Sequence, residues 1–298
     1  MQILITGGTG LIGRALCAAL VNAGHQVTVL SRRPETVQAK CGAAVQAMSA
    51  LSEWQADKIF DAVINLAGEP IIDAPWTQQR QQRLWDSRVT LTEELVSRIA
   101  SLEQKPQVLL SGSATGYYGN AGDTLLYEAA PHASDFGAQL CAAWEHAALK
   151  AAAANIRVCL LRTGLVLDPA GGLLGRMLLP FKLGLGARIG DGSQWMSWIH
   201  IEDYVAIVLR LLADSAAEGA FNTTAPNPST NKVFTQTLAK VLHRPAFWVA
   251  PAWLMQLALG KRAYLLLGGQ CALPSRVEAL NYRFSYPDLE GALRAILD

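Results

Sequence analysis

Residues 6–13 read TGGTGLIG, and they separate an apolar run, Gln2–Ile5, from the first helical stretch, Arg14–Ala23. Two overlapping sets of glycines in this loop match the G-x-G-x-x-G spacing of dinucleotide-binding loops and its common variant. Glycine is needed there for a tight turn, for the approach of backbone N–H groups to a pyrophosphate, and for close packing of helix on strand. We therefore expect six residues of the loop to bind a dinucleotide: Gly7, Thr9, Gly10, Leu11, Ile12 and Gly13.

Apolar runs and helical stretches alternate downstream of this loop. Helical stretches such as Thr90–Ala100 carry apolar residues three or four positions apart, as an amphipathic helix does. Strands that alternate with helices predict an α/β fold with a doubly wound parallel Rossmann sheet. The strand-like runs are Gln2–Ile5, Gln26–Leu30, Ala62–Asn65, Gln107–Ser111 and Arg157–Arg162.

The texture of the sequence changes after about Leu167, where glycines become frequent, beginning with GGLLG at 171–175. We expect residues 1–167 to form the dinucleotide-binding Rossmann domain. Residues 168–298 are expected to form a smaller C-terminal substrate lobe that ends in a segment punctuated by prolines.

The composition limits the classes of partner. The chain of 298 residues has 25 Lys and Arg against 24 Asp and Glu, so its net charge is +1. That balance argues against a nucleic acid or a membrane surface as a partner. The five cysteines are scattered, and no cluster has metal-ligand spacing, so we expect no bound metal. The chain begins on an apolar run without a basic leader, which favours a cytoplasmic protein.

The second strand-like run ends in Ser31, Arg32 and Arg33, with no acidic residue. In a dinucleotide-binding fold the tip of this strand meets the adenosine ribose. An acid there binds the free 2′-hydroxyl of NAD, whereas an arginine accommodates the 2′-phosphate of NADP. A guanidinium can bind two phosphate oxygens at once. NADP(H) is therefore the predicted cofactor, and the alternative is a solvated basic turn.

Several motifs in register carry a resemblance to a known family. In chain order they are TGGTGLIG, NLAGEP (65–70), SGSATGYYG (111–119), LRTGLVLD (161–168) and GDGSQWMSWIHIEDY (190–204). The chain resembles the extended short-chain dehydrogenase/reductase superfamily of the NAD-dependent epimerase/dehydratase type. It is more similar still to a branch of "epimerase family" proteins that share the GYYG, WIHIED and TNKVF-like elements. These proteins end in a short domain of unknown function that resembles residues 246–298.

The resemblance implies further cofactor contacts. It places Leu66, Ala67 and Gly68 against the adenosine side of the cofactor. It also implies that Arg88, in WDSRVTLT, contacts the cofactor, with a surface helix arginine as the alternative. The backbone at Gly164 and Leu165 would face the nicotinamide.

The resemblance also exposes a departure from the family pattern. Most members carry a Tyr-x-x-x-Lys pair on the helix that follows the SGSATGYYG strand, and the lysine helps the tyrosine to transfer a proton. Here Phe136 and Leu140 stand at those positions, and neither can exchange a proton. The remaining catalytic candidates are Ser113 (with Thr115 as an alternative register), Tyr117 and Tyr118, although paired tyrosines at a strand end also serve in packing. His200 in WIHIED is a less favoured acid or base.

Two function hypotheses follow from these residues. The first is an NADP(H)-dependent oxidoreductase or nucleotide-sugar-epimerase-like enzyme that acts on an unknown small molecule, as a monomer or homodimer. The second is an NADP(H)-binding sensor or interaction protein without redox turnover. The fold alone does not decide between them.

Overall fold

The computed structural model describes residues 1–55 and 57–297 of the chain. A seven-stranded sheet, entirely parallel, has the order β12-β7-β5-β4-β1-β2-β3. This confirms the predicted doubly wound parallel sheet. Its strands are β1 (Gln2–Thr6), β2 (Gln26–Leu30), β3 (Gln46–Met48), β4 (Ala62–Asn65), β5 (Val108–Ala114), β7 (Arg157–Thr163) and β12 (Gly219–Thr223).

The central strands are apolar along their whole length because helices cover both faces of the sheet. Successive side chains of β1 point to opposite faces. Ile3 and Ile5 pack into one hydrophobic cluster, while Leu4 packs into another, and all three are fully buried. The uninterrupted run ILI at 3–5 therefore belongs to a strand with two buried faces.

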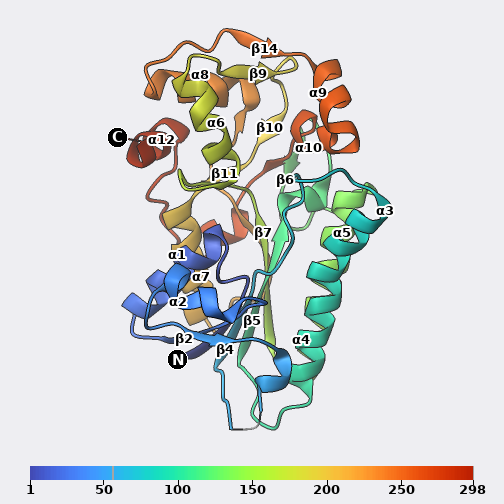
Figure 1. Ribbon diagram of the computed structural model, residues 1–298, viewed down its shortest axis with the longest axis vertical. Helices are drawn as coiled ribbons and strands as arrows, with labels where there is room; N and C mark the ends of the chain where they lie inside the picture. The colour runs from blue at the N-terminus through green and yellow to red at the C-terminus, as the bar shows by residue number, and fades with distance from the viewer. Residues whose placement is uncertain (56, 298) are drawn as a thin grey trace.

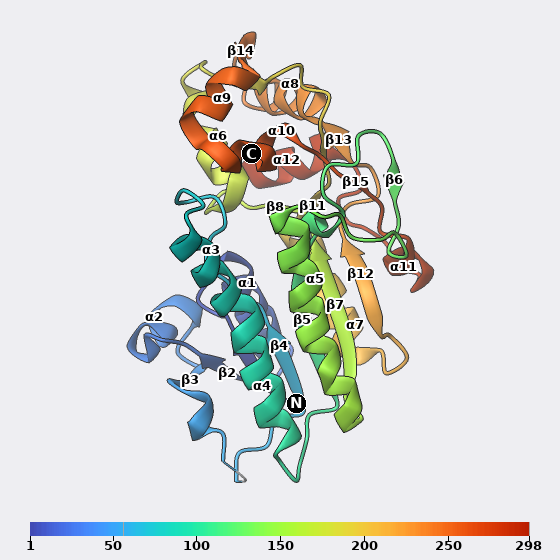
Figure 2. The same ribbon diagram turned by 90° about the vertical axis from the view of Figure 1, so that its right-hand side faces the viewer.

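Helices α1, α2 and α7 cover one face of the sheet, and α3, α4 and α5 cover the other (Figures 1 and 2). The expected helix Arg14–Ala23 corresponds to α1, which begins three residues earlier because Gly10 is its N-cap. The helices are α1 (Leu11–Asn22), α2 (Val37–Cys41), α3 (Gln78–Trp85), α4 (Leu91–Ala100), α5 (Phe136–Leu149), α6 (Gly172–Lys182), α7 (Ile201–Ala213), α8 (Asn231–Val241), α9 (Ala252–Leu259), α10 (Tyr264–Leu267), α11 (Ser275–Ala279) and α12 (Leu289–Leu297).

A second lobe lies beyond the carboxyl ends of the strands, at the top of Figure 1. It contains α6, α8, α9, α10 and α12, and its core includes Trp198 and Phe234. Four two-stranded pairs complete it and join it to the sheet: β8 (Leu165–Leu167) with β11 (Trp198–His200), β9 (Ala187–Ile189) with β14 (Trp248–Ala250), β10 (Trp195–Met196) with β13 (Ser229–Thr230), and β6 (Leu125–Leu126) with β15 (Cys271–Ala272).

The second half of the chain does not stay in this lobe. After residue 167 it returns to the sheet, because α7 packs on the β1 face and β12 forms the edge strand beside β7. The sheet is therefore completed by residues that lie outside the expected 1–167 domain. The division at residue 167 stays a prediction about domains.

The segment WIHIEDY joins the sheet to the C-terminal residues. His200 caps α7, since its Nδ1 accepts the Glu202 N–H at 3.1 Å, and its ring stacks on Tyr286 at 3.8 Å. Asp203 is buried and accepts hydrogen bonds from the Tyr282 hydroxyl and from the Ser285 and Tyr286 N–H groups. Both side chains therefore hold α7 to residues 282–286. Among the described residues, no helix has the length and apolar character needed to cross a membrane.

Candidate functional site

A cleft of about 970 Å³ opens at the carboxyl ends of β1, β2 and β4. This is the point where the strand order reverses between β1 and β4, and ligands of open α/β sheets bind at such switch points. Eight of the residues predicted to bind the cofactor line the cleft: Gly7, Thr9, Gly10, Ser31, Arg32, Leu66, Ala67 and Gly68.

Each glycine of the loop is required for a different structural reason. Gly7 has a φ of +71°, and a Cβ there would lie 2.6 Å from the Leu66 carbonyl oxygen. A Cβ on Gly13 would lie 2.4 Å from the Gly7 carbonyl oxygen, so close packing of α1 on the loop requires glycine. Gly10 is exposed, and its Cβ would meet only the Gly7 carbonyl oxygen, at 3.2 Å. Gly10 therefore leaves room on the cleft side rather than inside the fold.

The N-terminus of α1 is left free for a ligand. No side chain caps it, and its first turn contains no acidic residue. By contrast, Asp135 caps α5 and Thr230 caps α8 through their side chains. The free N–H groups and the positive end of the helix dipole form a site for a phosphate.

The tip of β2 carries a cation in an ion pair. Arg32 has an 89% exposed side chain, and its Nη2 lies 2.9 Å from Glu69 Oε1. Glu69 also lies 3.4 Å from Arg80 Nη1, and hydrogen bonding from Arg32 is the main cause that holds the pKa of Glu69 below its usual value. The Ser31 Oγ accepts the Arg33 N–H at 3.1 Å and shapes the turn. Arg33 is exposed and lies outside the cleft lining.

Arg88 lies just behind the cleft. It belongs to a short π-helical segment, Asp86–Thr90, that joins α3 to α4. Its Nη2 donates to the Glu69 carbonyl oxygen at 2.9 Å, and a Cβ on Gly68 would lie 2.9 Å from its Cζ. The guanidinium also lies 5.4 Å from the ring centroid of Trp144. Burial lowers the pKa of Arg88. Arg88 is thus a half-buried cation beside the cleft rather than a surface residue.

The remaining predicted cofactor residues are not in the cleft lining. Leu11 and Ile12 belong to the first turn of α1. Gly164 packs against the segment before β11, because its Cβ would lie 2.3 Å from the Ser197 carbonyl oxygen, and the Leu165 N–H donates to that oxygen at 2.7 Å. These two residues join β7 to the second lobe, and their contact with a nicotinamide stays a prediction.

The positions expected for the Tyr-x-x-x-Lys pair are part of an apolar cluster. Phe136 packs edge to face on Trp76, with ring centroids 5.1 Å apart. Leu140 is 1% exposed and packs with Leu84 and Trp144. A lysine at position 140 would place an ammonium group in this cluster without a partner, at a cost of several kcal/mol.

Ser113 lies on β5 and belongs to a buried ionic network. Its hydroxyl donates to Glu145 Oε1 at 2.7 Å. The same carboxylate binds Arg162 in two places, Nε to Oε1 at 2.8 Å and Nη2 to Oε2 at 2.9 Å. Burial disfavours the charged guanidinium, but the hydrogen bonds and charge of Glu145 outweigh it and raise the pKa of Arg162. All three residues are less than 9% exposed.

The two tyrosines differ although they are neighbours. The Tyr118 hydroxyl donates to Asn222 Oδ1 at 2.7 Å and accepts from Arg162 Nη1 at 2.9 Å. Burial raises the pKa of Tyr118. Tyr117 is only half-buried, and its ring lies 3.6 Å from Arg162 Cζ in a cation–π contact. Tyr117 is therefore the phenol that lies nearer to solvent.

Sequence reasoning missed Glu145, and it used Arg162 only as a strand end. The signal was present, because each charge stands in an apolar stretch, AAWEHAAL and CLLRTG. A buried charge needs a partner, but the sequence does not say which charge pairs with which. Among the described residues, no group of three or more His, Cys, Asp or Glu side chains could hold a metal ion.

Comparison with known proteins decides the family. A family model described as the NAD dependent epimerase/dehydratase family matches residues 3–223. The chain belongs to the NAD-dependent epimerase/dehydratase family. A second model, described as a domain of unknown function (DUF1731), matches residues 250–296. It coincides with most of the C-terminal segment.

Relatives of this epimerase-family chain match it over its whole length. The "Epimerase family protein YfhF" of Bacillus subtilis is 36% identical and covers 100% of the chain and 98% of its own length. The chloroplastic SDR39U1 homologue of Arabidopsis thaliana is also 36% identical, over 100% of the chain and 87% of its own. A crystal structure of human epimerase family protein SDR39U1 with NADPH is similar at a TM-score of 0.90, with 36% identity and 99% of each chain covered.

Proposed function

We propose that this epimerase-family protein is an NADP(H)-dependent oxidoreductase or epimerase-like enzyme that acts on a small molecule. The observation that carries the proposal is the cleft at the strand switch point. There the uncapped N-terminus of α1 and the arginine at the tip of β2 face the same space. The human relative crystallised with NADPH supports the same cofactor.

The residues of the cleft fit this cofactor. The glycine loop leaves a cradle that a Cβ on Gly10 would fill, and the free N–H groups of α1 suit the pyrophosphate. Ser31 and Arg32 suit the 2′-phosphate, for which Arg32 would exchange its pairing with Glu69. Arg88, beside Gly68, is placed to contact the cofactor further along the cleft. Bound NADPH would supply the hydride.

On the substrate side we assign the oxygen contact to Ser113 and the proton to Tyr117. Arg162 already binds both oxygens of Glu145, so the Ser113 hydroxyl can turn from that carboxylate and donate to a substrate carbonyl oxygen. Tyr117 is preferred over Tyr118, whose hydroxyl already makes two buried hydrogen bonds. The cation–π contact with Arg162 holds the Tyr117 ring beside this network.

A second candidate is a protein that binds NADP(H) without redox turnover. The apolar packing of Phe136 and Leu140 favours it, because the family's proton-transfer pair is absent from these positions. Positioned proton transfer typically contributes about 10²–10⁴-fold to rate.

Titration with NADPH and NADH, followed by NADPH oxidation over a panel of carbonyl compounds, separates the candidates. Tighter binding of NADPH with turnover that falls in Tyr117→Phe supports the enzyme. Tight binding without turnover on any compound would establish the second candidate. Equal affinity for both cofactors would contradict the assignment of Arg32 to the 2′-phosphate.

A further inference from the structure

The end of the second lobe carries a continuous apolar surface. Six large apolar side chains there are between 53% and 77% exposed. We call them the distal patch: Leu183, Leu185, Phe247, Trp248, Trp253 and Leu257.

Contacts between three segments make the patch continuous. β14 runs beside β9, with Trp248 opposite Ala187, and the rings of Phe247 and Trp248 are 5.4 Å apart. A Cβ on Gly184 would touch Pro245 at 3.7 Å, so the loop after α6 lies against the residues before β14. α9 follows β14 after a single proline, and it carries Trp253 and Leu257 one turn apart.

Helix α9 is largely apolar, yet it lies at the surface. Its sequence, AWLMQLAL, has no charged residue, yet none of its side chains is buried. A helix that is apolar all round is normally buried in a core or in lipid. A soluble monomer rarely exposes a large contiguous apolar patch unless the patch contacts something.

The charged residues within the two segments that form the patch are of one sign. The two segments that form it, 169–190 and 241–268, contain six Lys or Arg residues and no Asp or Glu. Removing these six from the total of 25 leaves 19 basic residues against 24 acidic ones elsewhere in the chain. Two acids adjoin these segments, because Asp73 is paired with Arg176 and Asp191 directly follows residue 190. The six cations still outnumber them, so the net charge of +1 conceals a basic end of the molecule. The six are Arg176, Lys182, Arg188, Arg244, Lys261 and Arg262.

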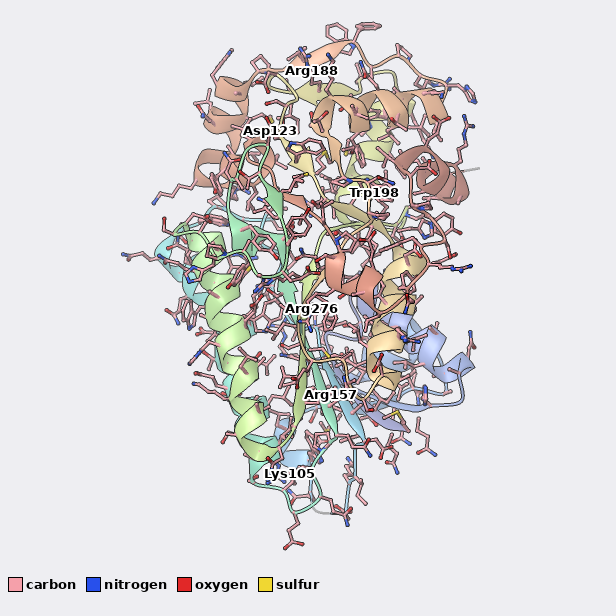
Figure 3. All side chains as sticks on the ribbon, turned by 180° about the vertical axis from the view of Figure 1, so that it is seen from behind. Lys105, Asp123, Arg157, Arg188, Trp198 and Arg276 are labelled. Carbon is pink, nitrogen blue, oxygen red and sulfur yellow. The ribbon has the colours of Figure 1, made fainter. Side chains whose placement is uncertain are left out.

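Several of these cations are available to a partner. Lys182, Arg244 and Lys261 are exposed, and within the described part of the chain none of the three is in an ion pair. The Arg244 Nε donates to the Lys182 carbonyl oxygen at 2.9 Å, which places these two residues side by side. Arg188 lies in β9 at the end of the molecule opposite Lys105 (Figure 3).

We propose that the distal patch docks the protein on an anionic lipid surface. The aromatic and leucine side chains would enter the headgroup region, and Lys182, Arg188, Arg244 and Lys261 would contact lipid phosphates. Tryptophan favours this depth because its ring is apolar and its N–H is polar. The combination of an apolar face with a cationic rim is that of interfacial membrane-binding helices.

The charge pattern favours lipid over a second copy of the chain. A two-fold dimer through this patch would bring Lys182, Arg244 and Lys261 of one copy against those of the other, and like charges across an interface oppose association. An anionic bilayer has the complementary charge over a wide area, and each lysine or arginine near it contributes about 1 kcal/mol. The strands whose ends line the cleft, β1, β2 and β4, lie in the lower half of Figure 1, far from β14 and α9 at the top.

Sedimentation with lipid vesicles tests the proposal. Wild-type protein should bind vesicles of phosphatidylcholine mixed with phosphatidylglycerol and should bind far less to phosphatidylcholine alone. The variant Lys182→Gln with Arg244→Gln should bind the anionic vesicles about 25-fold more weakly, since two charges are lost. Trp253→Ser with Leu257→Ser should lose binding and also the blue shift of tryptophan fluorescence that vesicles cause.

A matched control is Lys105→Gln with Leu149→Ser, which changes an exposed cation at the other end of the molecule (Figure 3) and an exposed apolar residue at the C-terminal end of α5. It should bind vesicles like wild type, and all variants should keep their NADPH affinity. Binding that does not depend on phosphatidylglycerol, or that all variants retain, would overturn the proposal. So would a wild-type dimer that Trp253→Ser with Leu257→Ser converts to a monomer.

Discussion

The two sides of the site treat their polar groups differently. On the cofactor side, the N-terminus of α1 has no cap and Arg32 is almost fully exposed. On the side that we propose for the substrate, Ser113, Glu145 and Arg162 satisfy one another inside the protein. The first side is prepared for an anionic ligand. The second is a buried network whose polar groups are already paired with one another.

Removing the buried ion pair between Arg162 and Glu145 should produce the largest effect, a loss of folding stability. In Arg162→Met the Glu145 carboxylate stays buried without its cation, and the free energy of unfolding should fall by about 3–5 kcal/mol. Urea unfolding measures this. The control is Arg210→Met, which removes an exposed pair with Asp214 and should cost no more than about 0.5 kcal/mol. Equal losses for both variants would show that burial of the Glu145 pair does not matter.

Bulk at Gly10 should abolish cofactor binding while the protein stays folded. The Cβ of Gly10→Val meets one backbone oxygen and then points into the space where the pyrophosphate approaches. We expect NADPH affinity to fall by more than about 100-fold, a loss of about 2.7 kcal/mol. Gly116→Ala, where a Cβ would meet nothing within 4 Å, is the control. Normal binding by a folded Gly10→Val protein would refute the assignment of the glycine loop.

The two arginines at the tip of β2 should contribute unequally to NADPH binding. Replacing both with alanine should weaken NADPH binding about tenfold or more and leave NADH nearly unchanged, because charge-assisted contacts are worth roughly 1.5–3 kcal/mol. Arg32 lines the cleft and Arg33 does not, so Arg32→Ala alone should account for most of the loss. Isothermal titration of the two single variants measures this. A loss from Arg33→Ala as large as from Arg32→Ala would contradict the geometry.

Ser113→Ala tests the hydrogen bond from β5 to Glu145 and the proposed substrate contact together. The hydroxyl donates to a carboxylate that Arg162 already binds twice, so its removal should cost about 1 kcal/mol of stability. NADPH affinity should be unchanged, because Ser113 lies outside the cleft lining. Any carbonyl reduction should weaken, as steady-state rates would show. An unaffected rate would move the substrate contact away from β5.

Much of the cofactor side could be predicted from the sequence because its signals are local. The glycines of residues 6–13 and the basic tip of β2 are adjacent along the chain, and their roles follow from a short strand–loop–helix unit. Pairings between distant residues could not be predicted. Glu145 and Arg162 come from different elements, and the ion pair of Arg32 with Glu69 joins two loops. Each charge is visible in the sequence, but its partner is set by packing.

The uneven distribution of charge over the surface could not be predicted from the sequence for a similar reason. A net charge of +1 argues against a membrane surface only if the charges are evenly spread. The two segments of the distal patch are about 50 residues apart in the chain, and β9 and β14 bring them together. In the same way, β12 comes from the second half of the chain and pairs with β7 at the edge of the sheet. The sequence does not show this pairing between distant segments.

The smallest effect should come from Glu69, the acid that pairs with the exposed Arg32. Glu69→Gln removes the carboxylate from Arg32 and frees it for the 2′-phosphate, so NADPH affinity should rise, by up to about fivefold for a surface pair of this kind. The pKa of Glu69 is lowered, mainly by hydrogen bonding from Arg32, so the carboxylate stays charged down through the usual titration range of glutamate. The affinity ratio between variant and wild type should therefore be constant from neutral pH to about pH 4.5 and should shrink only below it. Titrations of both proteins across that range cancel the protonation of the phosphate itself. A ratio that already collapses near pH 6 would show that Glu69 does not hold Arg32.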